Sequence, residues 1–271
     1  WLTGPAAAGL QAKAYMALSK GKTTFKGYEG YVFENPLSSF SASETDILDT
    51  RLDGAGKAVS IVDMPSAGNA PGKLSATVVC SVLEDGGDAS FTTLTLPFSP
   101  FRAYVGVEIP KEKEGYMFTD KDNTVSMVLL SEDGQPLAGH NMEYRVYKID
   151  WSWWWENGRR GLDSYVNSSS AKVYASGRFV SGKNPSTFTL NVPEKDWGRY
   201  LIYVKDRDGG HASGLTTLVD WPSYQGRGDH KDPTAVNMLS FSLDKKSYAV
   251  GETRPAASEL EPCRVRKVES E

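Results

Sequence analysis

Several features that would mark an enzyme, a nucleic-acid-binding protein or a membrane-spanning protein are missing from this 271-residue sequence. It has two cysteines, three histidines and a net charge of −4, and its lysines and arginines form no long basic block. No apolar run approaches the roughly 18 residues that suggest a membrane-spanning helix. We therefore expect no nucleic-acid partner and no membrane contact by this segment.

Catalytic motifs are also missing. The sequence contains no Gly-x-Ser-x-Gly nucleophile turn, no His-Glu-x-x-His metal motif, no phosphate-binding loop and no dinucleotide fingerprint. Its 34 acidic residues would allow many carboxylate pairs for acid–base chemistry, but no pattern in the sequence brings two of them together. We predict that the chain is not an enzyme and that it needs no cofactor.

Metal-binding patterns are weak. His140, His211 and His230 are far apart in the sequence, so a zinc site would need them to converge in the fold, and we interpret them as surface or hairpin histidines. Residues 120–123 and 206–209 carry carboxylates at alternate positions, as some calcium loops do, but both lack the closing glutamate of such a loop. Because aspartate and asparagine readily bind their own backbone, we predict turns at both places and no metal site.

What the sequence does contain is an alternation of apolar and polar residues with a period of two, clearest at residues 10–19, 74–82 and 187–192. Successive side chains of a strand point to opposite faces, so each stretch predicts a strand with one buried and one solvated face. Aspartate–glycine turns separate the strands, at residues 53–54, 85–86, 133–134 and 208–209. No stretch of ten residues has the pattern of an amphipathic helix. The predicted fold class is all-β, with antiparallel β-sandwich domains.

Two boundaries divide the chain. Prolines interrupt the strand pattern at residues 97–100, and residues 221–233 are rich in glycine, proline and charge. A weak repeat, in which residues 4–9 and 134–139 both form a turn before a strand, suggests two domains of one type. We predict β-sandwich domains at 1–100 and 101–224, the first strand of a third domain at 235–253, and an atypical tail at 254–271 that does not alternate.

The most unusual local feature is a tryptophan-rich loop, predicted at residues 150–170 of the second domain. It contains Trp151, Trp153, Trp154 and Trp155, followed by Arg159 and Arg160. Four indoles in five residues cannot all face one core from a strand, because alternate positions point in opposite directions. We favour packing under the loop or against a neighbouring domain. The alternative is a surface binding module in which these six residues hold a carbohydrate or protein ligand.

Four segments, in order along the chain, resemble bacterial α2-macroglobulins. They are residues 1–10, 27–33, 197–204 and 241–253. The last combines Asp-Lys, then Tyr, then Gly-Glu, which looks like the pattern that opens a domain in that family. The resemblance implies tandem macroglobulin-like (immunoglobulin- or fibronectin-like) sandwiches of about 100 residues, located just before the domain that carries the protease bait.

By the same resemblance, the chain is a non-catalytic scaffold fragment of a broad-spectrum protease inhibitor that traps proteases after bait cleavage. Its expected partners are the neighbouring domains of the parent chain and the target proteases. Its expected location is the periplasm or cell envelope, with any lipoprotein anchor upstream of Trp1. The family's thioester motif has Gln soon after Cys, whereas Cys80 is followed by Ser-Val-Leu and Cys263 by Arg-Val-Arg, so we expect no thioester in this chain.

Overall fold

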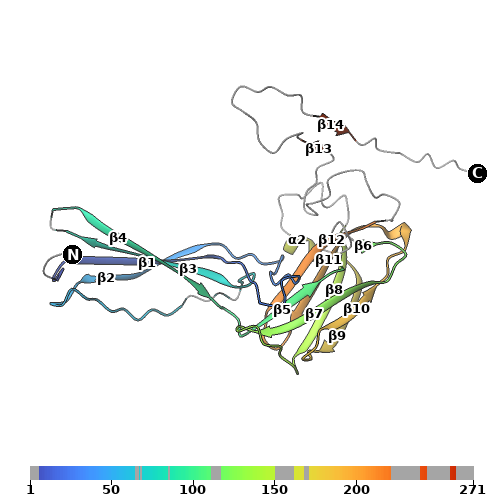
Figure 1. Cartoon of the computed structure of the whole chain (residues 1–271), viewed down its shortest axis with the longest axis horizontal. Helices are drawn as coiled ribbons and strands as arrows, with labels where there is room; N and C mark the ends of the chain where they lie inside the picture. The colour runs from blue at the N-terminus through green and yellow to red at the C-terminus, as the bar shows by residue number, and fades with distance from the viewer. Residues whose placement is uncertain are drawn as a thin grey trace, which may run out of the picture.

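The structure is a computed structural model that describes residues 6–64, 67, 69–84, 86–110, 117–149, 162–167 and 171–220, and the backbone of strands 239–242 and 257–260. The described residues between 6 and 220 form two lobes, an elongated single sheet and a two-layered sandwich (Figure 1). The helical elements among these described residues are the short helix α2 (Leu162–Val166) and the 3-10 turn η1 (Glu194–Asp196). The predicted all-β fold class with antiparallel sheets is confirmed.

The first lobe is one antiparallel sheet in the order β2-β1-β3-β4. Its strands are β1 (Gln11–Lys20), β2 (Ser43–Arg51), β3 (Leu74–Leu83) and β4 (Ala89–Phe98). The alternating stretches at 10–19 and 74–82 are the central strands β1 and β3, and they pair along their whole length. Ala12, Ala14, Met16 and Leu18 of β1 are buried on one face, as the period of two predicts.

The second lobe packs two sheets face to face, in the orders β10-β7-β5 and β6-β12-β11-β8-β9. The strands are β5 (Ala103–Glu108), β6 (Met117–Phe118), β7 (Asn123–Ser131), β8 (Asn141–Ile149), β9 (Lys172–Val180), β10 (Ser186–Leu190), β11 (Gly198–Asp206) and β12 (Ala212–Asp220). Inward-facing side chains of both sheets, such as Val105 and Val125 from one and Val146 and Ile202 from the other, form one fully buried core. Interdigitated inner faces of this kind hold a β-sandwich together.

Both turn predictions agree with the structure. Asp120 adopts a φ of 55° in the turn after β6, and the hairpin between β11 and β12 has Gly210 at a φ of 80°. The first turn is secured by Asn123, whose amide nitrogen donates to the carbonyl oxygens of Phe118 at 2.8 Å and Leu190 at 3.1 Å. The asparagine thereby satisfies the backbone at the end of the sandwich.

Two further strands are described by their backbone alone. Strand β13 (Leu239–Ser242) pairs antiparallel with β14 (Ala257–Leu260). The first lies in the segment expected to open a third domain. The second lies in the tail that lacks alternation, so the sequence pattern did not predict it. In the described part of the chain, no helix has the length and apolar character needed to cross a membrane.

Candidate functional site

The predicted tryptophan site lies outside the described residues. This holds for all six of its members, Trp151, Trp153, Trp154, Trp155, Arg159 and Arg160. The surface-binding interpretation and the packing interpretation therefore both stay predictions. The described residues nearest to the segment are Ile149, which ends β8, and Leu162, which begins α2.

The junction of the two lobes brings together described residues that are distant in the sequence. An arm of the first lobe, residues 23–37, lies against the second lobe and forms a two-way backbone bridge with it. Val32 donates its amide to the carbonyl of Val107 at 2.8 Å and accepts the Val107 amide at 3.0 Å. Further along, Ser213 Oγ donates to the Val32 carbonyl at 2.7 Å, and the Gly214 amide donates to the Glu34 carbonyl at 3.2 Å. The arm is thus tied to both sheets of the sandwich.

A shared hydrophobic cluster lies beneath these hydrogen bonds. Phe25 and Phe33 of the arm pack with Tyr104, Val128 and Leu130 of the second lobe, and all five are buried. The Phe25 ring lies 4.8 Å from the Phe33 ring and 5.7 Å from the Tyr104 ring, between centroids. These separations fall in the range where tilted aromatic pairs stabilise one another. The two lobes therefore share one core at the junction.

Gly106 allows the arm to lie close to strand β5 of the second lobe. A Cβ atom at this position would lie 2.6 Å from Cε1 of Phe33 and 2.9 Å from Cγ2 of Val128. Both distances are too short for a real contact, so a residue larger than glycine would push the Phe33 ring out of its place. The sequence alone gave no signal for this requirement, because the contact joins residues 73 positions apart (106 − 33).

His211 lies in the same junction and is completely buried. It follows the β11–β12 turn, as the hairpin interpretation expects, but it does not lie on the surface. Its ring packs against Phe101 and Tyr104 at centroid distances of 4.8 and 4.9 Å. The Val105 amide donates to His211 Nδ1 at 2.8 Å, so Nδ1 is an acceptor and the ring proton resides on Nε2.

Burial lowers the pKa of His211 to about 4, because the charged ring would lose its hydration. The carbonyl groups of Pro71 and Phe33 act in the opposite direction and favour the protonated ring. Neither carbonyl is in hydrogen-bonding geometry with Nε2, which has no partner among the described residues. The imidazole at the junction is therefore neutral at pH 7.

A second cluster brings together His140, Asp206 and Asp208. His140 Nδ1 lies 3.0 Å from Asp206 Oδ2, and single ligand atoms of the three residues all lie within 4.8 Å of one another. Each carboxylate already has other donors. The Asp208 amide donates to Asp206 at 3.0 Å, and the Asn141 amide donates to Asp208 at 2.7 Å. This is how a carboxylate-rich turn satisfies its backbone, so we interpret the cluster as a tie between the β11–β12 hairpin and the start of β8.

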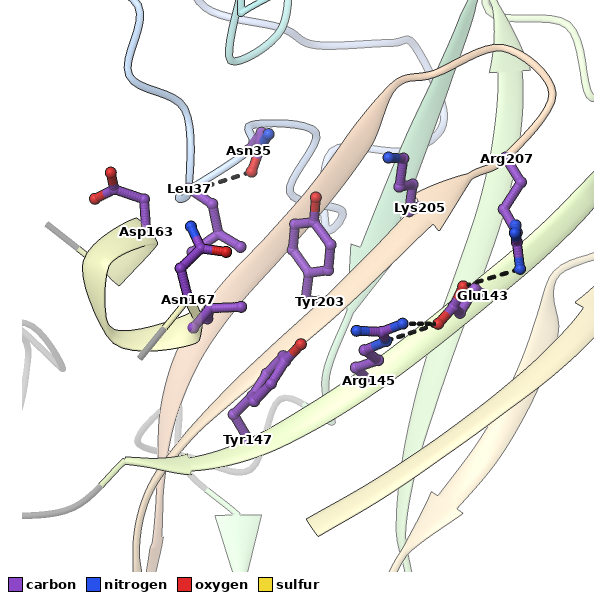
Figure 2. Close-up of a pocket in the computed structure, with 11 residues that line it drawn as sticks. Asn35, Leu37, Glu143, Arg145, Tyr147, Asp163, Asn167, Tyr203, Lys205 and Arg207 are labelled. Carbon is purple, nitrogen blue, oxygen red and sulfur yellow. Dashed lines mark hydrogen bonds and ion pairs between the residues drawn. The ribbon is translucent and has the colours of Figure 1, made fainter. Parts of the chain in front are cut away.

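A polar groove of about 620 Å³ lies beside the junction, between the end of the arm, α2 and the outer face of β8 and β11 (Figure 2). Its lining residues are Asn35, Leu37, Glu143, Arg145, Tyr147, Asp163, Val166, Asn167, Tyr203, Lys205 and Arg207. Arg145 and Arg207 point at the Glu143 carboxylate, at 2.6 and 3.4 Å. The hydrogen bond from Arg145 is the main reason why the pKa of Glu143 is lowered. The described lining offers no Ser–His or Cys–His pair, so we find no nucleophilic site there.

Comparison with known proteins agrees with this architecture. The model of the bacterial α2-macroglobulin MG5 domain matches residues 1–100, and the model of bacterial macroglobulin domain 6 matches residues 106–221. No curated protein matches the sequence.

Solved structures of bacterial α2-macroglobulins are among those that match. Trypsin-activated α2-macroglobulin from Escherichia coli has a TM-score of 0.55 and 14% identity, over 90% of this chain and 16% of that chain. Salmonella α2-macroglobulin reacted with methylamine has a TM-score of 0.49 and 16% identity, over 93% and 16%. At 14% identity, the similarity to the Escherichia coli structure shows the fold alone. The chain spans about one sixth of the length of these relatives.

Proposed function

Because the chain belongs to the bacterial α2-macroglobulin family, we propose that it is a non-catalytic scaffold segment of a protease-trapping inhibitor. Its two lobes would hold the neighbouring domains of a longer protein at a fixed distance and orientation. When a protease cuts the longer protein, the segment would transmit the resulting rearrangement as one body. Proteases that activate the parent protein and the adjoining domains are then its partners, and the periplasm or cell envelope is its place of action.

The observation that supports this proposal most is the shared core of the junction. Phe33 is completely buried between the lobes, and the backbone bridge between Val32 and Val107 fixes the arm beside it. Two domains joined by a flexible linker move relative to one another by default, whereas a hydrophobic interface restricts that motion. A segment built in this way suits the transmission of force. The relative from Escherichia coli is described as trypsin-activated, which names a class of protease to use in a test.

The test is made in the longer family protein that contains this segment, with trypsin as the protease. Phe33→Ala should remove the central contact of the junction, whereas Ile61→Ala, at a site that is 96% exposed, is the control. If the longer protein encloses trypsin after cleavage, the enclosed trypsin should still hydrolyse a small chromogenic substrate but be shielded from a large protein substrate. We expect Phe33→Ala to lose most of this size discrimination and the control to keep it.

Phe33→Leu distinguishes loss of the junction from loss of the whole fold. It keeps an apolar side chain in the cluster and should restore much of the trapping. The thermal midpoint of each variant shows whether the rest of the protein is folded. If Phe33→Ala loosens the junction, judged by protease sensitivity between the lobes, and trapping is unchanged, the scaffold proposal is wrong.

A further inference from the structure

The two edges of the first-lobe sheet differ in chemistry. Strand β2 carries Glu44, Asp46, Asp49 and Arg51, and its pairing with β1 is interrupted by a register shift. Strand β4, at the opposite edge, has no charged residue in its ten positions, and neither does β3 beside it. Charges and bulges are the devices with which proteins prevent edge strands from pairing with other chains. The β2 edge has both devices, and the β4 edge has no charge.

Strand β4 is also open to solvent on both of its faces. Phe91 on one face is 72% exposed, and Leu94 and Leu96 on the other face are 56% and 49% exposed. No described strand pairs with the free edge of β4. Pro97 lacks an amide proton and so disfavours pairing with another strand, but it lies next to the last residue of β4 and leaves the rest of the edge unaffected. The stretch from Ala89 to Leu96 is left as an uncharged edge, in which serine and threonine residues alternate with exposed Phe91, Leu94 and Leu96, and such an edge is a template for strand addition.

The charge pattern selects the partner. If β4 of a second copy pairs antiparallel with β4, it brings no charge to the contact. Threonine and leucine side chains of one copy then pack against those of the other, and the two-fold axis of the pair closes the assembly. Pairing of β4 with β2 of another copy would place three carboxylates and one arginine beside a strand that has no opposite charge to pair with them, and it would leave open ends that propagate.

We propose that β4 is an association edge, at which two copies of this chain join their four-stranded sheets into one eight-stranded sheet. The prediction concerns the isolated chain and is independent of protease trapping, so it can fail while the proposed function holds.

The test measures the self-association of the purified chain by sedimentation velocity over a range of about 1 to 100 μM. The wild type should convert from monomer to dimer within this range. The double variant Phe91→Lys/Thr93→Lys places two cations from each copy at the interface and should raise the dimer dissociation constant at least about tenfold. Because the wild-type contact is uncharged, its dissociation constant should change less than about twofold between low and high salt.

The matched control is Ser43→Lys/Thr45→Lys, which adds the same charges at exposed positions of the β2 edge. It should associate like the wild type. Circular dichroism melts confirm that both double variants are folded, and hydrogen exchange gives a second readout: β4 amides should gain protection as the concentration rises, while β2 amides should not. A chain that stays monomeric at the highest concentration, or one that dimerises equally well with lysines in β4, overturns the proposal.

Discussion

The two lobes are made of the same kind of strand but acquire their cores differently. The second lobe has two sheets, so residues such as Val146 and Ile202 are completely buried by its own strands. The first lobe has one described sheet, and its buried cluster around Met16 and Leu74 is small and covered by connecting segments. The arm of the first lobe then contributes Phe33 to the second lobe. A single sheet cannot bury both of its faces, so the first lobe depends more on what packs against it.

One leucine from each lobe gives the sharpest test of this difference. Leu129 of β7 is buried in the core between the two sheets of the second lobe, whereas Leu94 of β4 is 56% exposed. Leu129→Ala should lower the free energy of unfolding by about 2–5 kcal/mol, because it leaves a cavity in a packed core. Leu94→Ala should cost below about 1 kcal/mol, since little buried area is lost.

Urea unfolding, followed separately by hydrogen exchange in each lobe, measures both values. Equal losses in the two variants would show that the first-lobe sheet is covered as completely as the sandwich, and the two lobes would then not differ in how they form their cores.

The junction itself should make the stability of the molecule depend on pH through His211. Its pKa in the folded state is about 4, below the ordinary value of about 6.5 for an unfolded chain. The unfolded state therefore binds the proton first, and stability is lost as the pH falls from about 6.5 to about 4, by about 3 kcal/mol in all. Protonation of His211 would also turn Nδ1 into a donor, so that it could no longer accept the hydrogen bond from the Val105 amide.

The replacement His211→Phe should remove this part of the pH dependence. It also leaves the Val105 amide without its acceptor, so the variant should be less stable than the wild type at pH 7, by about 1–3 kcal/mol. The control is His140→Gln, at a partly exposed histidine outside the junction. Denaturant midpoints at pH 7 and at pH 4.5 give the result. A wild type and a His211→Phe variant that lose equal stability between these pH values would contradict the assignment.

The strand pattern was predictable because it is local. A period of two placed β1, β3 and β10, and aspartate–glycine pairs marked turns, among them the β11–β12 hairpin, since both signals depend on neighbouring residues. The junction was not predictable, because Phe33 meets Gly106 only after the two lobes have folded together. His211 shows the same limit. Its position after a turn was evident from the sequence, whereas its complete burial depends on Phe101, Tyr104 and the arm.

The smallest expected effect concerns the surface charges of the second lobe. Glu143 pairs with Arg145 and Arg207, whose side chains are about half exposed, and these arginines lower its pKa. Because the folded-state pKa is lowered, the pairing stabilises the protein above the ordinary glutamate value of about 4.3 and is lost as the pH falls through the lowered value. Solvent screens such pairs, so Glu143→Gln should cost about 0.2–1 kcal/mol at pH 7.

Glu44 on β2 is the matched control, because it is exposed on the first lobe. Glu44→Gln should change stability by less than about 0.5 kcal/mol. Urea midpoints at low and high salt separate the two cases, since only the Glu143 effect should shrink as salt is added. An equal, salt-independent loss in both variants would mean that the ion pair around Glu143 does not stabilise the sandwich. The Glu143 carboxylate would then serve only to orient the Arg145 and Arg207 side chains that line the groove beside the arm.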